Sequence, residues 1–246
     1  MIIVTRPSPY GEELVQLCHQ AKLAAKYLPF FNIVKGHDLD NLQHHLDSLQ
    51  QGDVVIIVSP QVNLMIGALQ TKIKFPDFVQ YFAVGQQTAK QFQMLSNQLV
   101  AYPPQHENSE GLVEYFQSID LCVIGRQVLV LCGDIGRTFI QESLHAQGAL
   151  IKNIKCYHRK KIDYPSTLFF KQEKYCFVIT SIEHLLQLEL YCSDMHKHNC
   201  CLIVSSTRIM TAAKLHHWRH IYLADNANNQ NLFKTIATLC HNATSI

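Results

Sequence analysis

The stretch Val84–Lys90 reads VGQQTAK, and Val204–Lys214 repeats its plan as VSSTRIMTAAK. Each stretch begins at the end of a short apolar run, passes through small polar residues and continues into a helical pattern that contains a Thr-Ala pair. Strand, small-residue turn and helix in this order form the unit of parallel α/β proteins, because the helix carries the chain back across the sheet. The two stretches therefore predict an α/β fold that is built twice.

Outward from these stretches, three further units recur in the same order. They are a strand, helix and second strand with an aromatic tail; a strand that ends in serine; and a strand with a loop and a helix. Their copies span residues 2–31 and 128–158, 54–59 and 177–181, and 99–116 and 221–239. Two copies of one four-part unit predict two similar parallel-sheet lobes with a pseudo-two-fold relation and a cleft between them.

Small or polar residues follow every predicted strand. The strands are expected at residues 2–4, 54–58, 81–84, 128–131, 176–179 and 201–204. Helices are expected at 12–21 and 138–147, the second ending at Gly148, since glycine suits the position after a helix C-terminus. Ligands of open α/β sheets bind beyond the carboxyl ends of the strands. These loops are therefore the expected site, before any family is considered.

Composition sets broad limits. Of the 246 residues, 48% are apolar and 16% charged, which is typical of a globular protein. A net charge of +2, with Arg159–Lys161 as the longest basic run, argues against nucleic-acid binding. The longest aliphatic run, Val54–Val58, is too short to cross a bilayer. The apolar start is soon broken by Arg6 and Pro7, so no signal peptide is predicted and we expect a cytoplasmic protein.

The nine cysteines include no Cys-x-x-Cys pair. Several fall in predicted apolar strands, so we interpret them as buried, reduced thiols; these are Cys122, Cys132, Cys176 and Cys201. The clusters around His216 and around His196 lack the spacing of a zinc site, and no metal site is predicted. The first cluster is expected to end a helix, where histidine is favoured.

The stretch Gly133–Arg137 follows a strand and opens a helix, but it matches neither the P-loop nor the dinucleotide pattern. Two interpretations stay open: a helix start whose backbone N–H groups suit a carboxylate or phosphate, or a plain tight turn. No Ser-His-Asp set and no pair of carboxylates stands out. An enzyme built this way would act mainly by positioning its substrate.

The order and spacing of several short motifs resemble the uroporphyrinogen-III synthase family over nearly the whole chain. The motifs are Val4–Pro7, Gly11–Leu14, Val58–Pro60, Ala83–Gly85 with Thr88-Ala89, Ser109–Leu112, Leu129–Asp134 with Gly136-Arg137, Gly148-Ala149, Cys156–Arg159, Val178–Ser181, Val204–Ser206, Arg208 and Ala224–Ala227. Two departures concern the second copy. An acidic residue that many relatives carry near Thr207 is absent, and the next helix ends in His216–Trp218 without the usual glycine.

The resemblance implies the fold and the reaction. Members look like two α/β lobes joined by a two-stranded connection, here residues 1–30 plus 162–246, and residues 31–161. The implied substrate is hydroxymethylbilane, a chain of four pyrroles with eight carboxylates. It loses water and closes to uroporphyrinogen III with its terminal ring inverted, in tetrapyrrole and haem biosynthesis. A hydro-lyase of this kind, monomeric and without cofactor or metal, needs neither a nucleic acid nor a membrane as partner.

The resemblance also assigns candidate roles to residues. Tyr157 matches the family's catalytic tyrosine and is expected to protonate or hydrogen-bond the departing hydroxyl, although an aromatic anchor of the connection is the alternative. Thr88 either caps a helix or donates to a carboxylate. Arg6 and Arg137 either pair with substrate carboxylates or brace their own loops. The remaining expected substrate-binding residues are Ser59, Gln61, Gly85, Ser109, Gly133, Asp134, Ser181 and Ser205.

Two rival functions remain open at this stage. A bilobed binding protein, such as a tetrapyrrole carrier, would keep the fold without turnover. An enzyme acting on another anionic metabolite would use the same loops. Tyr157 together with Thr88 favours the synthase over both.

Overall fold

The computed structural model describes residues 1–169 and 174–243. The chain divides into two compact units, Met1–Asn32 with Lys160–Ile246 (unit 1) and Ile33–Arg159 (unit 2). The chain passes between them twice, within strands β3 (Phe31–Lys35) and β8 (Leu150–Lys161), which are neighbours at one edge of a sheet. The cleft expected between the lobes stays a prediction.

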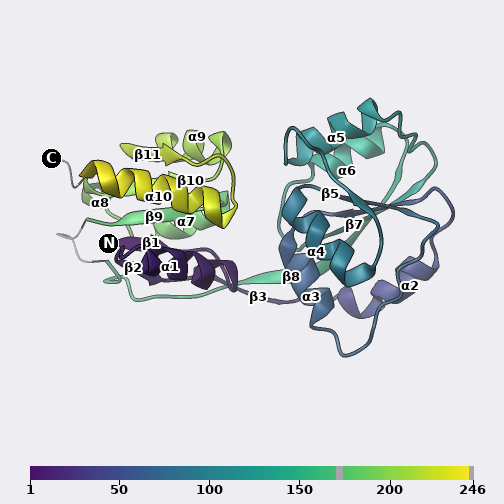
Figure 1. The fold of residues 1–246 in the computed structure, drawn as a ribbon, viewed down its shortest axis with the longest axis horizontal. Coiled ribbons are helices and arrows are strands. Elements are labelled where there is room, and N and C mark those ends of the chain that lie inside the picture. Colours follow the sequence, from purple (N-terminus) through teal and green to yellow (C-terminus); the bar gives the residue numbers. More distant parts are fainter. Residues whose placement is uncertain (170–173, 244–246) are drawn as a thin grey trace. The chain divides into compact units, whose positions relative to one another are not determined.

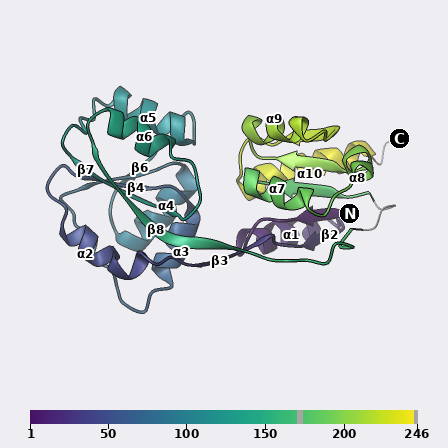
Figure 2. The ribbon, with the colours of Figure 1, turned by 180° about the vertical axis from the view of Figure 1, so that it is seen from behind.

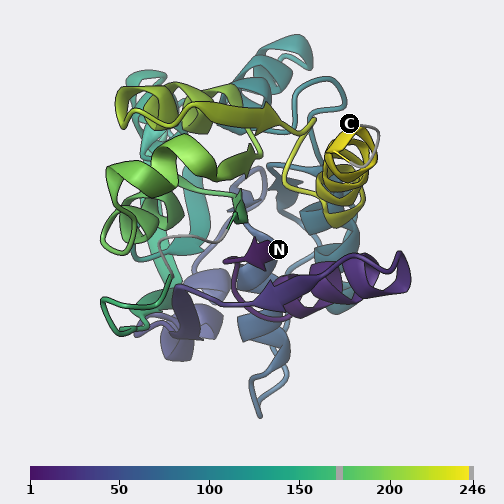
Figure 3. The same cartoon turned by 90° about the vertical axis from the view of Figure 1, so that its left-hand side faces the viewer.

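Unit 1 is a parallel sheet with the strand order β11-β10-β9-β1-β2. Its strands are β1 (Ile2–Val4), β2 (Ala25–Tyr27), β9 (Cys176–Ile179), β10 (Cys201–Val204) and β11 (His220–Leu223). Helices α1 (Tyr10–Gln20) and α10 (Asn229–Ala243) pack side by side against one face (Figures 1 and 3). Helices α7 (Ile182–Glu189) and α9 (Thr207–Leu215) cover the other face (Figure 2), and α8 (Asp194–Asn199) leads into β10.

Unit 2 contains a sheet with the order β3-β8-β7-β4-β5-β6. The remaining strands are β4 (Val54–Ile57), β5 (Gln80–Ala83), β6 (Val100–Ala101) and β7 (Gln127–Gly133). One face carries the 3₁₀ helix η1 (Leu39–Asn41), α2 (Leu42–Asp47), α3 (Pro60–Gly67) and α4 (Gln86–Ser96); the other carries α5 (Ser109–Ser118) and α6 (Phe139–Ala146). Because both faces are covered, β4 is apolar and buried throughout: Val55 and Ile57 face α3 and α4, whereas Val54 and Ile56 face α5 and α6.

The predicted repeat is confirmed by the strand orders. The sequence β11-β10-β9-β1-β2 in unit 1 corresponds, strand for strand, to β6-β5-β4-β7-β8 in unit 2. Each repeat copy therefore contributes its first segment, a strand, helix and second strand, to one sheet. Its other three segments lie in the other sheet. The two-lobed parallel α/β class is thus confirmed.

Both sheets reverse their strand order at one point. In unit 1 it lies between β1 and β9, and in unit 2 between β7 and β4. At such a switch point the loops that leave neighbouring strands run to opposite faces of the sheet, which opens a crevice at the carboxyl ends. The loops concerned begin at Thr5 and Thr180 in unit 1, and at Val58 and Asp134 in unit 2. This geometry places most of the predicted site residues at or beside the two switch points.

Two local predictions meet different outcomes. Gly148 ends α6 with φ +88°, and the amides of Gly148 and Ala149 donate to the carbonyls of His145 and Leu144, as expected of a C-terminal glycine. The prediction for Cys122 is wrong: this residue is exposed and lies in the turn before β7, whereas Cys176 is buried and Cys132 and Cys201 are partly buried in strands. In the described part of the chain, no helix is long and apolar enough to cross a bilayer.

Candidate active site

The carboxyl edge of the unit 2 sheet gathers most of the predicted residues. Ser59 and Gln61 follow β4, Gly133 ends β7, Asp134 follows it and Tyr157 lies in the neighbouring strand β8. Gly85, Thr88, Ser109 and Arg137 lie in the helix starts and loops that follow β5, β6 and β7 at the same edge. Arg6, Ser181 and Ser205 follow β1, β9 and β10 of unit 1. The predicted residues therefore form one group in each unit.

A β-bulge directs Tyr157. Cys132 pairs with Lys155, but the next residue, Gly133, pairs with Tyr157, so Cys156 is an extra residue in β8. A bulge of this kind shifts the alternation of side chains, and bulges are frequent beside active sites. As a result Tyr157 joins Cys156 in the core beneath α3 and α4 instead of facing α5 and α6.

The phenol of Tyr157 is held from two sides. Arg159 Nη2 donates to the phenol oxygen at 3.4 Å, and the Arg159 guanidinium lies 5.6 Å from the ring centroid. The Ser59 hydroxyl is hydrogen-bonded to the same phenol. Burial raises the pKa of Tyr157, while Arg159 and Ser59 oppose that rise. The phenol is therefore protonated at neutral pH, and with donors on its oxygen its own proton is available for transfer.

Gly133 and Asp134 fix the backbone of this segment. A Cβ on Gly133 would lie 2.6 Å from the Tyr157 ring, so only glycine leaves room for the phenol. The Asp134 amide donates to the Tyr157 carbonyl at 3.0 Å. In turn, Asp134 Oδ1 accepts from the Arg159 amide at 3.4 Å. Asp134 is therefore hydrogen-bonded to β8 on both sides of His158.

Serines cap helices at two of the predicted positions. Ser59 is the N-cap of α3 and accepts from the Gln61 amide at 3.2 Å, and Ser181 is the N-cap of α7 and accepts from the His184 amide at 3.3 Å. A serine or threonine oxygen in this place satisfies one of the free N–H groups of the helix start. Gln61 itself is buried in the first turn of α3.

At three other predicted positions, another residue caps the helix. The N-cap of α4 is Gly85, and Thr88 is a buried residue of the first turn, so its predicted capping role is wrong. Asn108, rather than Ser109, caps α5, and its side chain accepts from the Gly111 amide at 2.8 Å. Ser206 caps α9, while Ser205 is buried and donates to the Thr180 carbonyl at 3.4 Å. In a short polar run, several neighbouring residues have side chains that can cap a helix. The sequence therefore does not show which of them is the N-cap.

The start of α4 holds a carboxylate of the chain itself. Glu107 Oε2 accepts from the Gln86 amide at 2.8 Å, and a Cβ on Gly85 would lie 2.6 Å from the same oxygen. A helix start attracts anions, because its N–H groups are free and the helix dipole is positive there. The exposed Glu107 thus shows that this end of α4 accepts a carboxylate.

Both arginines have partners within the chain. Arg6 donates to the Ala227 carbonyl at 2.9 Å and to Asn229 Oδ1 at 2.6 Å, which ties the β1 loop to α10. Burial lowers the pKa of Arg6 to about 10, so its charge is retained at neutral pH. Arg137 forms a two-pronged ion pair with Glu110, which raises its pKa. The loop-bracing interpretation therefore describes both residues in this structure, and Arg208 is exposed on α9.

Sequence reasoning assigned no site role to Arg159, His158 and His37. Arg159 belongs to a basic run and to the Cys156–Arg159 motif, and it follows Tyr157 by two residues in the same strand, β8. His37 and His158 are stacked with a Nδ1-to-Nε2 distance of 3.1 Å. No pattern in the sequence links two histidines so far apart, and only the pairing of β3 with β8 brings them together.

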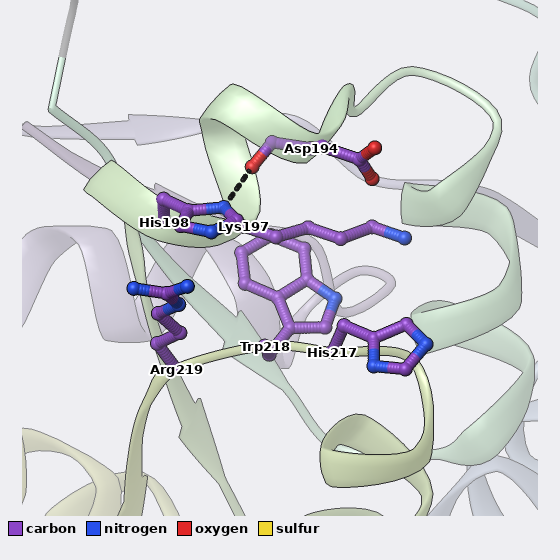
Figure 4. Close-up of a pocket in the computed structure, with 6 residues that line it drawn as sticks. All are labelled: Asp194, Lys197, His198, His217, Trp218 and Arg219. Carbon is purple, nitrogen blue, oxygen red and sulfur yellow. Dashed lines mark hydrogen bonds between the residues drawn. The ribbon is translucent and has the colours of Figure 1, made fainter.

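A separate hollow of about 500 Å³ lies in unit 1 at the amino ends of β10 and β11. Figure 4 shows the indole of Trp218 in its centre, with the other lining residues around it: Asp194, Lys197, His198, His217 and Arg219. It contains none of the predicted site residues and faces the sheet edge opposite to them. Among residues 1–169 and 174–243, no group of three or more His, Cys, Asp or Glu side chains is arranged to hold a metal ion.

The fold is that of a class of two-unit α/β proteins, and ligands of such open sheets usually bind beyond the carboxyl ends of the strands. Within that class, the family model described as uroporphyrinogen-III synthase HemD matches residues 12–234. The chain is 31% identical over 248 aligned residues to uroporphyrinogen-III synthase of Escherichia coli K12, covering 96% of this chain and 99% of that one. It is 34% identical to the Proteus mirabilis enzyme of the same name, over 68% of this chain and 84% of the relative.

Two solved structures share the fold. A mutant uroporphyrinogen III synthase of the extremely thermophilic bacterium Thermus thermophilus superposes with a TM-score of 0.62 at 11% identity, over 100% of this chain and 99% of that one. The uroporphyrinogen-III synthetase of Helicobacter pylori superposes with a TM-score of 0.61 at 15% identity, over 97% of this chain and 98% of that one. The family match and the relatives show that this chain belongs to the uroporphyrinogen-III synthase family, whose activity is that of a hydro-lyase of tetrapyrrole biosynthesis.

Proposed function

We propose that the chain binds hydroxymethylbilane at the carboxyl-end loops of its two sheets and closes it to uroporphyrinogen III with inversion of the terminal ring. The membership of the family supports this reaction. The single observation that carries the assignment of residues is the group around Tyr157, where a buried, protonated phenol meets Ser59 and Arg159 at a switch point.

The substrate's acetate and propionate groups are anions, and the loops offer positive or N–H-rich partners for them. The start of α4 at Gly85 already accepts the carboxylate of Glu107, and Arg137 already binds that of Glu110. Glu107 is exposed, and the exposed Arg137–Glu110 ion pair contributes little net stability, so both carboxylates can be exchanged. Substrate carboxylates are proposed to replace Glu107 and Glu110 on these groups.

The same proposal includes further contacts along the loops. Ser59, Gln61, Ser109, Gly133 and Asp134 line the edge in unit 2, with Thr88 beneath it. Arg6, Ser181 and Ser205 supply the corresponding contacts in unit 1. Most of this binding is assigned to backbone N–H groups, since the serine oxygens of Ser59 and Ser181 already cap helices. Single alanine replacements of these serines are therefore expected to lower activity by less than a hundredfold.

Tyr157 is proposed as the proton donor to the departing hydroxyl. The pKa of a buried phenol lies above its usual value of about 10, which keeps its proton in place at neutral pH. Donors from Ser59 and Arg159 stabilise the phenolate that forms when the proton leaves. General acid catalysis of this kind contributes on the order of 10²- to 10⁴-fold.

The test replaces Tyr157 by phenylalanine and compares initial rates with fresh hydroxymethylbilane, the products being oxidised and separated as uroporphyrin isomers. We expect kcat to fall at least about 100-fold, with an unfolding free energy within about 3 kcal/mol of wild type, the usual range for the two hydrogen bonds lost with the phenol oxygen. Tyr115→Phe, on α5, is the matched control. A Y157F variant with wild-type kcat would exclude the catalytic role and leave that of an aromatic anchor.

Three further features belong to the same proposal. The two lobes are taken as residues 1–30 plus 162–246 and residues 31–161, and the chain is proposed to act as a monomer in the cytoplasm. All nine cysteines are free, which agrees with a reducing compartment. Light scattering coupled to size-exclusion chromatography tests the oligomeric state, and a mass near twice the 28.1 kDa of one chain would replace the monomer by a dimer.

A further inference from the structure

Four side chains form a continuous row beside Tyr157. His158 Nδ1 lies 3.1 Å from Asp134 Oδ2, His158 Nε2 lies 3.1 Å from His37 Nδ1, and His37 Nε2 lies 3.1 Å from Asp38 Oδ1. The two imidazole rings are nearly parallel, with an interplanar angle of 17° and centroids 5.1 Å apart. The row joins the loop after β7 to the loop after β3 across strand β8.

The number of protons in this row follows from its geometry. It contains three contacts between hydrogen-bonding atoms, and each contact needs one proton to be attractive. Ionised carboxylates supply none, and two neutral imidazoles supply only two. The complete row therefore requires a third proton, so that one of the two histidines is an imidazolium at any moment and the other is neutral.

We propose that His37 and His158 share this single extra proton and that the singly charged pair positions Asp134, and through it the Tyr157–Arg159 segment. The positioning role rests on the proposed function of Tyr157. Asp134 Oδ2 lies 3.1 Å from His158 Nδ1, while Oδ1 accepts the amides of Ile135 at 2.9 Å and Arg159 at 3.4 Å. The Asp134 amide meanwhile donates to the Tyr157 carbonyl.

The far end of the row is anchored as well. Asp38 Oδ2 accepts from the Lys155 amide at 2.9 Å, so Asp38 is fixed to β8 while its other oxygen faces His37. Gly36 permits this approach, because a Cβ there would lie 1.9 Å from the Lys155 carbonyl oxygen. The charged and titratable groups that face the pair or its carboxylates include Asp134, Asp38, Lys155, Arg159, His45, Cys132, Cys156 and Tyr157.

The charge state decides which contacts survive. When the shared proton is lost at higher pH, one of the three contacts has two acceptors facing each other and must open. When a second proton is added at lower pH, two N–H groups face each other between the rings. The positioned state is therefore limited to a window of pH.

The first test observes the proton directly. In protein labelled with ¹⁵N-histidine, the four ring nitrogens of the pair are assigned by comparison with the H37N and H158Q variants. At the pH of maximal activity we expect the two outer nitrogens, His158 Nδ1 and His37 Nε2, to show the shift of a protonated nitrogen. The two inner nitrogens, His158 Nε2 and His37 Nδ1, are expected to show an intermediate shift, because they share one proton. Two neutral imidazoles at that pH, with only two protonated nitrogens, would overturn the shared proton, whatever the role of Tyr157.

The second test uses the pH profile of kcat for the formation of the type III isomer. The side-chain amide of the H37N variant supplies a non-titrating N–H to His158 Nε2, so the variant is expected to keep about half of the maximal rate and to lose the fall toward higher pH. H37L, which offers no donor, is expected to be reduced at least about threefold at every pH. The control is H220N, which removes an exposed histidine of unit 1.

The outcomes separate this inference from the proposed function. If the kcat of H37N falls toward higher pH with the same midpoint as the wild type, the positioning role is overturned, even if Y157F is inactive. A shared proton seen by ¹⁵N shifts together with a fully active Y157F variant would instead leave the row intact and refute the role of Tyr157. Circular dichroism of each variant across the same pH range excludes unfolding as the cause of a lost rate.

Discussion

Replacing Gly133 by alanine tests the site through the space beside Tyr157. The new Cβ would lie 2.6 Å from both Cε2 and Cζ of the ring and 3.0 Å from the phenol oxygen. An ordinary contact begins at 3.4 Å, so the ring must retreat by about 0.8 Å. Tyr157 is 2% exposed and packed on every side, and overfilling a core of this kind costs about 1–3 kcal/mol.

The same displacement moves the phenol away from its proposed catalytic position. A misplacement of about 1 Å is enough to lower a rate by roughly 100-fold when catalysis depends on positioning. We therefore expect G133A to lose about 1–3 kcal/mol of unfolding free energy and to lower kcat by about 10- to 100-fold. Urea denaturation measures the first quantity, and the rate of type III isomer formation measures the second.

The chain offers a matched control three residues away. Gly136 lies in the same loop, but a Cβ there would have nothing within 4 Å. G136A is expected to keep both its stability and its kcat within about twofold, since surface changes usually stay within about 0.5 kcal/mol. A G133A variant that matches G136A in both measurements would refute the reasoning, because it would mean that the ring has room to move without consequence.

Two further predictions concern stability. His217 follows α9 in the left-handed conformation, with φ +66°, where the related helix α6 has Gly148 at φ +88°. In urea denaturation, the free energy of unfolding is expected to rise by about 1 kcal/mol in H217G and to fall by about as much in G148A. The reason is that a left-handed backbone costs non-glycine residues about 1–2 kcal/mol. If both variants are as stable as the wild type, backbone strain at these positions is excluded. Burial raises the pKa of Tyr157 above that of the unfolded chain, so the unfolded state loses this proton first and the free energy of unfolding should fall as pH rises above about 10. In urea titrations at alkaline pH, the free energy of unfolding of Y157F should fall less steeply with pH than that of the wild type. The same dependence on pH in both proteins would show that folding does not protect this phenol from losing its proton.

Local patterns in the sequence were sufficient for the architecture. Apolar runs that end in small residues, such as Val54–Val58 before Ser59, mark buried parallel strands because both faces of the sheet are covered. The repeated order of the four units gave the matching strand orders of the two sheets. Gly148 marked the end of α6, since glycine adopts a positive φ at little cost. Strand ends then predicted where the site lies, because the carboxyl edge of a parallel sheet is common to all its loops.

The sequence alone therefore determined the α/β class, the repeat and the positions of the loops proposed to carry the site, all of which depend on neighbours along the chain. The tertiary structure decided the rest. The bulge at Cys156 depends on how β8 pairs with β7, and it turns Tyr157 toward Ser59. The row from Asp134 to Asp38 depends on β3 lying beside β8. Contacts between distant residues follow from the register of paired strands, and a period-two pattern along one strand carries no information about its partner's register.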